Sequence, residues 1–152
     1  MADQRQLWCP SGQPGEPEAV VLGVRTVRTG SCGGMAYLDI PVPAATAVEV
    51  VPAGIDPTRV LRFASHCVSG CGHWQDNACS LVEKIVVAVA GPDEASVPRC
   101  HLRPRCRWWQ QSGVAACHRC PLVETFVAAD DTDRQRISDP ANRPADVARQ
   151  VS

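Results

Sequence analysis

Apolar and polar residues follow different patterns in the two halves of the chain. Residues 19–28 read "AVVLGVRTVR", a segment rich in β-branched residues with partial alternation, and this pattern predicts a strand. Residues 35–42, "MAYLDIPV", and 46–54, "TAVEVVPAG", predict further short strands. Pro41 and Pro43 restrict that region to a sheet edge or a loop, because proline cannot donate a ladder hydrogen bond. The N-terminal half is therefore predicted to form short β-strands.

The C-terminal half instead shows helical spacing. Asp56 followed by Pro57 predicts the start of a helix, with the aspartate as its cap. Apolar residues then recur on one helical face, at Val60, Phe63, Ala64 and Cys67. We therefore expect Cys67 to leave the end of this helix pointing inward.

Two more helices are predicted further along. One covers about residues 78–90 and ends at Gly91-Pro92. Its apolar stripe consists of Cys79, Val82, Val86 and Val89. The other covers about residues 105–112, carries both Trp108 and Trp109, and stops at Gly113. Residues 121–129 form a short apolar run that fits either a strand or a helix.

Both ends of the chain are polar. Residues 1–18 contain "SGQPGEPE" and predict a flexible N-terminal segment. Residues 130–152 alternate charges around prolines and predict a mobile C-terminal tail. Residues 19–129 then form a single domain. The predicted fold class is α+β, with short β-strands in the N-terminal half and a cysteine-rich helical C-terminal half.

The most unusual feature of the composition is the number of cysteines, nine in 152 residues. Such counts occur in secreted disulfide scaffolds and in intracellular proteins with metal or cluster sites. The first residues lack the basic start and the apolar run that are typical of a secretory signal. The longest apolar stretch, residues 85–90, is far too short for a membrane span. An odd cysteine count also disfavours a closed disulfide framework. These features predict a cytoplasmic protein, away from membranes, whose reduced thiols serve as ligands.

Seven cysteines form two groups in the second part of the chain. The first is Cys67, Cys71 and Cys79, and the second is Cys100, Cys106, Cys117 and Cys120. Structural zinc sites usually draw their ligands from two tight knuckles, each a Cys-x2-4-Cys pair. Cys117 and Cys120 make one knuckle, but Cys100 and Cys106 make a poor second one. Iron–sulfur clusters tolerate irregular spacing, and the Cys120-Pro121 dipeptide is typical of the end of a bacterial cluster run.

The charge pattern also favours a cluster. The net charge of the chain is −1, yet residues 95–123 contain no acid. The arginines in and beside the second group are Arg99, Arg103, Arg105, Arg107 and Arg119. A 4Fe–4S cluster held by four thiolates is anionic, so these cations would offset its charge and raise its reduction potential. Trp108 and Trp109 would shield one face from water. The predicted domain is therefore iron–sulfur-binding and organised around one or two 4Fe–4S clusters, with zinc as the alternative.

The stretch from Cys79 to Pro121 carries a resemblance. "CSLVEKIV" followed by "PRCHLRPRCRWWQQSGVAACHRCP" resembles a pattern in small, mostly uncharacterised bacterial cysteine-rich proteins presumed to bind iron–sulfur clusters. It covers about a quarter of the chain, and its most specific piece is "CRWWQQSGVAACHRCP". The resemblance implies cluster ligation at Cys79, Cys100, Cys106, Cys117 and Cys120. It implies no settled activity, and the N-terminal half lies outside it.

The number of clusters depends on the supply of ligands. One 4Fe–4S cluster takes four thiolates, most naturally the second group. A second cluster would use the first group and needs a fourth ligand. We expect Cys32, in a glycine-flanked turn, to supply it, with Cys9 as the runner-up. If neither reaches, the fourth iron is open to solvent, to a substrate, or to His66 or His73. Alternatively, the two groups exchange members, as in two-cluster ferredoxins.

These features favour an electron-transfer or redox-responsive accessory module for a larger redox or enzyme partner. The chain contains no nucleophile elbow, P-loop or complete dinucleotide fingerprint, and we assign no catalytic residue. The alternatives are an enzyme whose open-iron cluster binds substrate and a zinc-stabilised interaction domain. Nucleic-acid binding by the arginines and tryptophans is less favoured, because the chain is nearly neutral.

Overall fold

A four-stranded antiparallel sheet lies at the centre of the computed structural model, which describes residues 6–26, 34–91, 97–127 and 129–151. Its strand order is β1-β4-β2-β3. The strands are β1 (Trp8–Gly12), β2 (Val20–Thr26), β3 (Gly34–Pro43) and β4 (Leu61–His66). Two further strands of two residues each, β5 (Trp74–Gln75) and β6 (Ala78–Cys79), form a separate small hairpin.

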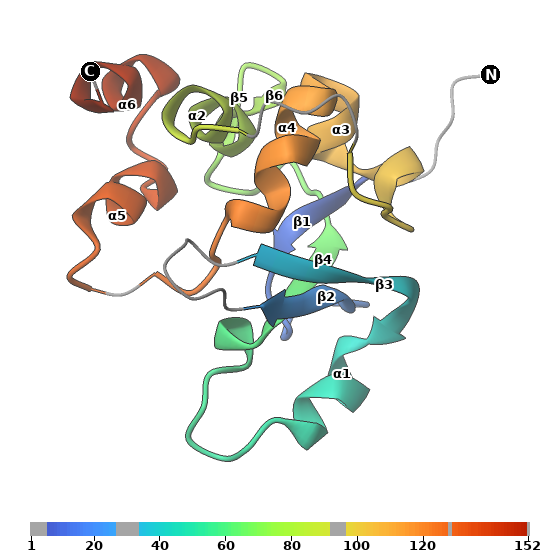
Figure 1. Cartoon of the computed structure of the whole chain (residues 1–152). Helices are drawn as coiled ribbons and strands as arrows, with labels where there is room; N and C mark the ends of the chain where they lie inside the picture. Colours follow the sequence, from blue (N-terminus) through green and yellow to red (C-terminus); the bar gives the residue numbers. More distant parts are fainter. Residues whose placement is uncertain (1–5, 27–33, 92–96, 128, 152) are drawn as a thin grey trace.

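Most of the helices lie on one side of the sheet, and α1 lies on the other (Figure 1). The α-helices are α1 (Ala44–Ala47), α2 (Ser80–Ala88), α3 (Arg107–Ser112), α4 (Val114–Arg119), α5 (Thr132–Ser138) and α6 (Pro144–Val151). Short 3-10 turns cover Val48–Val50, Pro57–Arg59, Arg103–Arg105 and Cys120–Leu122. The structure confirms a mixture of helices and strands with strands in the N-terminal half.

The sheet divides the core into two clusters because neighbouring residues of a strand point to opposite faces. Leu22 and Ala64 belong to the larger cluster, which also contains Trp108 and residues of α2. Val21 and Phe63 belong to the smaller cluster on the side of α1. Both faces of the two central strands are therefore covered.

The expected helix after Pro57 is instead a single 3-10 turn followed by β4. Asp56 does cap this turn, with Oδ1 accepting from the N–H of Thr58 at 2.9 Å. Residues 62–65 of β4 are all buried. β4 reads LRFASH and shows no strict alternation of apolar and polar residues, and the pattern of such a short buried strand cannot be distinguished from that of a short buried helix.

Of the other predicted elements, four are confirmed and one is wrong. The predicted strands 19–28 and 35–42 correspond to β2 and β3, and the predicted helices 78–90 and 105–112 correspond to α2 and α3. Residues 46–54 instead continue α1 into a 3-10 turn and then a loop. The open choice at residues 121–129 falls on neither a strand nor an α-helix in the part that is described.

Segments near both ends of the described chain are packed. β1 lies within the predicted N-terminal segment 1–18 and pairs with β4 at the edge of the sheet. α5 and α6 lie within the predicted C-terminal tail 130–152. Val147 on α6 is 1% exposed, because α6 packs on α2.

No helix in the described part of the chain combines the length and the apolar character that crossing a bilayer requires.

Candidate metal centre

The fold gathers four thiols from distant parts of the chain into what we call the first thiol group: Cys9, Cys67, Cys71 and Cys79. Cys9 lies on β1, and Cys67 directly follows β4, with its N–H donating to the carbonyl of Leu7 at 2.8 Å. Cys79 ends β6 and is the N-cap residue of α2. All four line one cavity. Strand pairing therefore places the N-terminal cysteine beside three that follow it much later.

The thiols of the first group affect one another's pKa values. Burial raises the pKa of the Cys9 thiol to about 12, and the neighbouring thiols of Cys79, Cys67 and Cys71 raise it further against a hydrogen bond from Ser11. The Ser11 nitrogen lies 3.4 Å from the Cys9 sulfur, and the His73 nitrogen lies 3.4 Å from that of Cys71. Backbone N–H groups aimed at sulfur stabilise a thiolate or a cluster ligand once the proton has left.

A second thiol group consists of Cys100, Cys106, Cys117 and Cys120, which line another, smaller cavity. Cys106 is the N-cap residue of α3, and Cys117 lies on α4. Gly113 separates these two short helices with φ of 62°, a conformation that favours glycine. The resulting turn brings α4 back along α3, so that Cys117 and Cys120 return to the side of Cys106.

Burial is also the main cause of the raised pKa values in the second thiol group. It raises the pKa of Cys106 to about 12, against the N–H of Trp109, and the Cys120 and Cys100 thiols raise this pKa further. Burial also raises the pKa of Cys117, whereas the Arg103 side chain lowers it. Tyr37 lies beside Cys120, and its hydroxyl pKa is raised by burial and then by that thiol. In the metal-free chain the raised pKa values keep the Cys100, Cys106 and Cys117 thiols protonated at neutral pH.

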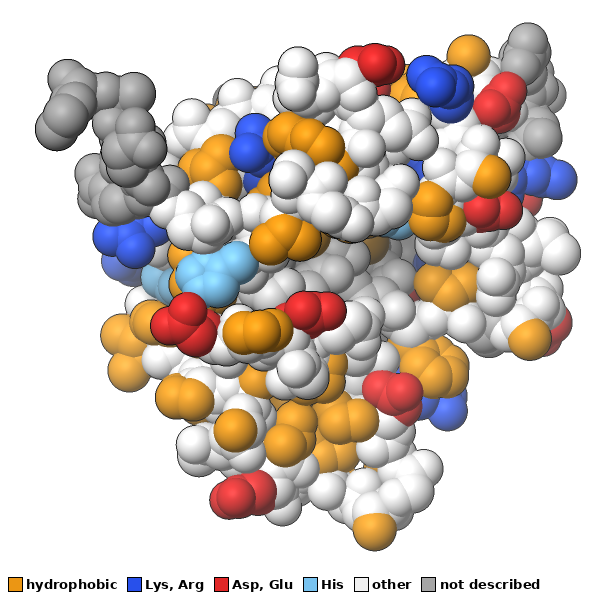
Figure 2. All heavy atoms as spheres, turned by 180° about the vertical axis from the view of Figure 1, so that it is seen from behind, with side chains coloured by type: hydrophobic (Ala, Val, Ile, Leu, Met, Phe, Trp, Pro, Cys, Tyr) orange, Lys and Arg blue, Asp and Glu red, His pale blue; other side chains and the backbone are white. Residues whose placement is uncertain are grey.

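The two groups differ in their access to solvent. The first thiol group lies at one end of a cavity of about 930 Å³ that extends between β1, α2 and α5. Figure 2 shows a hollow in the face turned away from the viewer of Figure 1, with histidine and acidic side chains around it. The cavity within the second thiol group measures about 20 Å³, the space of about one water molecule. A four-iron cluster would enter there only as these thiols move apart.

Two contacts connect the chain segments that carry the two groups, one through the backbone and one through a side chain. Trp8, which precedes Cys9 on β1, forms a parallel bridge with Cys106. Gln111 on α3 binds the main chain of Cys79 twice, accepting its N–H at 2.9 Å and donating to its carbonyl at 2.8 Å. The sequence offers no signal for either link, because both join residues that lie far apart along the chain.

The donor chemistry of both groups suits an iron–sulfur cluster. All eight cysteines that the structure describes are free thiols. Within the described ranges, no three side chains of His, Cys, Asp or Glu are placed to hold a single metal ion. A four-iron cube takes one thiolate at each iron, so its ligands stand farther apart than those of one zinc ion. Trp108 lines the second cavity, and its buried Nε1 has no hydrogen-bond partner. A cluster sulfide would accept from this N–H.

The arginines predicted to surround the second group make different contacts. Arg103 lies close enough to Cys117 to lower the pKa of that thiol. Arg107 instead stacks over the Trp74 ring at 4.8 Å, and Arg119 donates to the carbonyls of Val89 and Ala115. The fully buried arginine at this group is Arg62 on β4, whose Nη2 lies 3.5 Å from the Cys120 sulfur. The sequence carries no local signal of this position, because β4 reads LRFASH, with polar and apolar residues mixed.

The remaining candidate ligands have distinct positions. Cys32, the expected fourth ligand of the first group, lies outside the described residues, whereas Cys9, the runner-up, is within the group. The His66 Nε2 lies 2.9 Å from a carboxylate oxygen of Glu18. His73 lines the large cavity, and burial lowers its pKa. The Nδ1 atoms of both histidines are buried without a hydrogen-bond partner.

Comparison of this chain with models of protein families, with curated proteins and with solved structures found no match.

Proposed function

We propose that this protein is a two-cluster iron–sulfur protein of the reducing cytoplasm, which passes single electrons to or from a larger redox or enzyme partner. The observation that carries the proposal is the division of the eight described cysteines into two groups of four. Four thiolates are the full ligand set of one 4Fe–4S cluster. A bound cluster supplies one-electron redox chemistry, and the chain's own residues hold it, shield it and set its charge environment.

Assignment of ligands follows from the two groups. Cys9, Cys67, Cys71 and Cys79 would hold the first cluster, and Cys100, Cys106, Cys117 and Cys120 the second. This proposal replaces Cys32 by Cys9 as the fourth ligand of the first cluster. The links through Trp8 and Gln111 join the two sites through short stretches of backbone, an arrangement that suits transfer between them.

Anaerobic purification followed by iron and sulfide analysis tests the proposal. We expect a brown protein with about eight irons and as many sulfides for each chain. After reduction, electron paramagnetic resonance should show two interacting paramagnetic centres. A colourless protein with stoichiometric zinc would instead establish the zinc-stabilised interaction domain.

Two matched variants test the ligand assignment. Cys9→Ser should lower the iron content to about four for each chain, because it removes one ligand of the first cluster. Cys32→Ser should leave the iron content unchanged. The reverse result would return the fourth position to Cys32. Full iron in both variants would indicate a cluster with an iron that takes no thiolate from either residue.

An enzymatic role is favoured by one observation, the cavity of about 930 Å³ beside the first thiol group. That volume lies within the usual range of small-molecule sites. In this case a substrate would bind next to the first cluster, and His66 and His73 would border it. Spectral changes of the first cluster alone, on addition of candidate substrates, would distinguish this role from simple electron transfer.

A further inference from the structure

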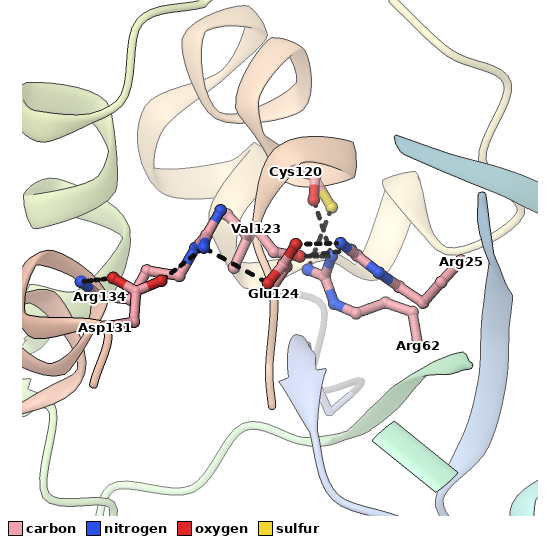
Figure 3. Close-up of polar contacts among 7 residues, drawn as sticks. All are labelled: Arg25, Arg62, Cys120, Val123, Glu124, Asp131 and Arg134. Atoms are coloured by element: carbon pink, nitrogen blue, oxygen red, sulfur yellow. Dashed lines mark hydrogen bonds and ion pairs between the residues drawn. The ribbon is translucent and has the colours of Figure 1, made fainter. Parts of the chain in front are cut away.

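Arg62 is a charged residue buried completely within the core. It lies on the central strand β4 with no exposed surface, and its guanidinium faces the second thiol group. Nε donates to the carbonyl of Pro10 at 2.9 Å, and Nη1 donates to the carbonyls of Cys120 and Val123 at 2.7 and 3.0 Å. Nη2 approaches the Cys120 sulfur at 3.5 Å. Figure 3 shows this fork pointing toward Cys120 and Val123.

Carboxylates near Arg62 are engaged elsewhere. Glu124 lies 3.4 Å from Arg25 and 3.5 Å from Arg134, and Asp131 pairs with Arg134 at 2.6 Å (Figure 3). Among the residues that the structure describes, no acid pairs with Arg62. The neighbouring Arg25 shares the Val123 carbonyl with Arg62 and adds a second positive charge to the same region. The second thiol group thus carries buried positive charge in excess of the nearby carboxylates.

An unpaired buried charge is costly in a protein interior, and neutral carbonyls and a thiol compensate it only in part. An anion beside Cys120 would complete the compensation. If the proposed function is correct, the second cluster and its four thiolates provide that anion, and Arg62 contacts one of its ligand sulfurs. The face of Trp108, 5.9 Å from the Arg62 guanidinium, closes the other side of this pocket.

In the first thiol group, no arginine or lysine of the described residues donates a hydrogen bond to a sulfur as Arg62 does. The buried Lys84 on α2 interacts electrostatically with Cys79, but its amine donates to the Asp139 carbonyl at 2.9 Å rather than to a thiol. Arg107 also lines the large cavity, but it stacks on Trp74. The two groups therefore present the same four ligands in different electrostatic environments.

We infer that Arg62 is the fixed counter-charge of the second cluster and holds the reduction potential of this cluster above that of the first. The inference rests on the proposed function. Reduction adds one electron, supplied in the test by dithionite, and no bond is made or broken. The added negative charge is stabilised by a cation that is already in place and shielded from water. Electrons entering at the open first cluster would then settle on the enclosed second one.

Redox titration of the separated clusters tests this inference. A Cys9→Ser background retains the second cluster only, so its signal in electron paramagnetic resonance is unambiguous. In that background, Arg62→Gln keeps an amide donor for the backbone carbonyls but loses the charge, and we expect its midpoint potential to fall. Arg62→Lys keeps the charge and should retain a midpoint close to that of the parent. An unchanged or higher midpoint in the glutamine variant would overturn the inference.

A control variant distinguishes the effect of a charge beside the sulfur on the midpoint potential from the effect of the net charge of the protein. Arg119→Gln removes an arginine that lies in the second half of the chain and binds carbonyls rather than a thiol. We expect it to leave the midpoint unchanged. An equal fall in this variant would show that net charge alone acts. In a Cys106→Ser background, Arg62→Gln should leave the first cluster unaffected, and a matching shift there would also contradict a local role.

Loss of the cluster gives a further readout. If folded Arg62→Gln protein binds no second cluster whereas Arg62→Lys binds it with the parental midpoint, the requirement is for charge, as inferred. If folded Arg62→Lys protein fails as well, Arg62 acts through its forked geometry and the inference is wrong. Circular dichroism establishes folding in each case. Parent protein that contains no iron would instead refute the proposed function and is distinguished from all these results.

Discussion

The two thiol groups place equal sets of ligands in unequal surroundings. The first is assembled from β1 and the segments around β4 and α2, and it opens into a large cavity. The second is built from the segment that runs from Cys100 through α3 and α4 to Cys120, and it is enclosed by Tyr37, Trp108 and Arg62. The difference teaches that the number of thiols alone does not define the character of either site. Access and buried charge separate two sites that a list of cysteines would treat as alike.

Ligand removal is the strongest way to test this comparison. Cys106→Ser should abolish the second cluster and also lower the stability of the fold, because Cys106 is buried and the substitution places a hydroxyl in the core. Cys71→Ser should abolish the first cluster with little effect on stability, since Cys71 is exposed. Iron analysis with thermal unfolding of the cluster-free chains measures both effects. Similar losses of stability in the two variants would contradict the contrast between an enclosed and an open site.

The tryptophans beside the two groups provide the next largest effect. Trp108 is 1% exposed, and Trp108→Ala should reduce the free energy of unfolding by about 3–5 kcal/mol. Trp74 is partly exposed near the first group, and Trp74→Ala should cost about 1 kcal/mol. Denaturant unfolding of the cluster-free proteins measures both values. A larger loss from Trp74→Ala would place the main core at the first group instead.

Alkaline pH should weaken both groups to the same degree. Burial raises the pKa of one thiol in each, Cys9 and Cys106, from 9.0 to about 12. Above pH 9 the unfolded chain releases these protons while the folded chain retains them, so stability falls as the pH rises toward 12. Each thiol contributes about 1.4 kcal/mol per pH unit in that window and nothing below it.

Unfolding of the reduced, cluster-free protein between pH 8 and pH 11 measures this slope. Cys9→Ala and Cys106→Ala should each reduce this slope. A stability that rises through the same range would show that the thiols ionise in the folded chain.

The smallest expected effect is kinetic and leaves equilibrium binding unchanged. A membrane-impermeant ferrous chelator should remove iron from the first cluster before the second, because only the first group borders the large cavity. Absorbance of the chelate, followed together with the two paramagnetic signals, gives the order. Simultaneous loss would indicate that both clusters are released by one unfolding event.

The sequence predicted the elements whose signals are local. The strand at Val20–Thr26 and the helix at Ser80–Ala88 were visible from β-branched residues and from a helical stripe that ends at glycine and proline. The second thiol group was also predicted as a unit, since its four members lie within residues 100–120. Short-range spacing carries enough information where the chain folds back over one tight turn.

What the sequence did not reveal depends on contacts between distant residues. Cys9 joins the first group through the pairing of β1 with β4. The register of this pairing cannot be predicted from the sequence of either strand alone. Arg62 lies in a strand that imitates a helical stripe, so neither its burial nor its direction could be read. The charged end of the chain packs through Ile137 and Val147, two apolar residues within a polar composition.

The place of Cys9 has a consequence for biosynthesis. Cys9 is synthesised before its partners in the first thiol group, and its thiol meets all of them only after the chain has grown past Cys79. The Cys9 thiol must therefore stay reduced during that interval, and its oxidation would prevent the group from assembling.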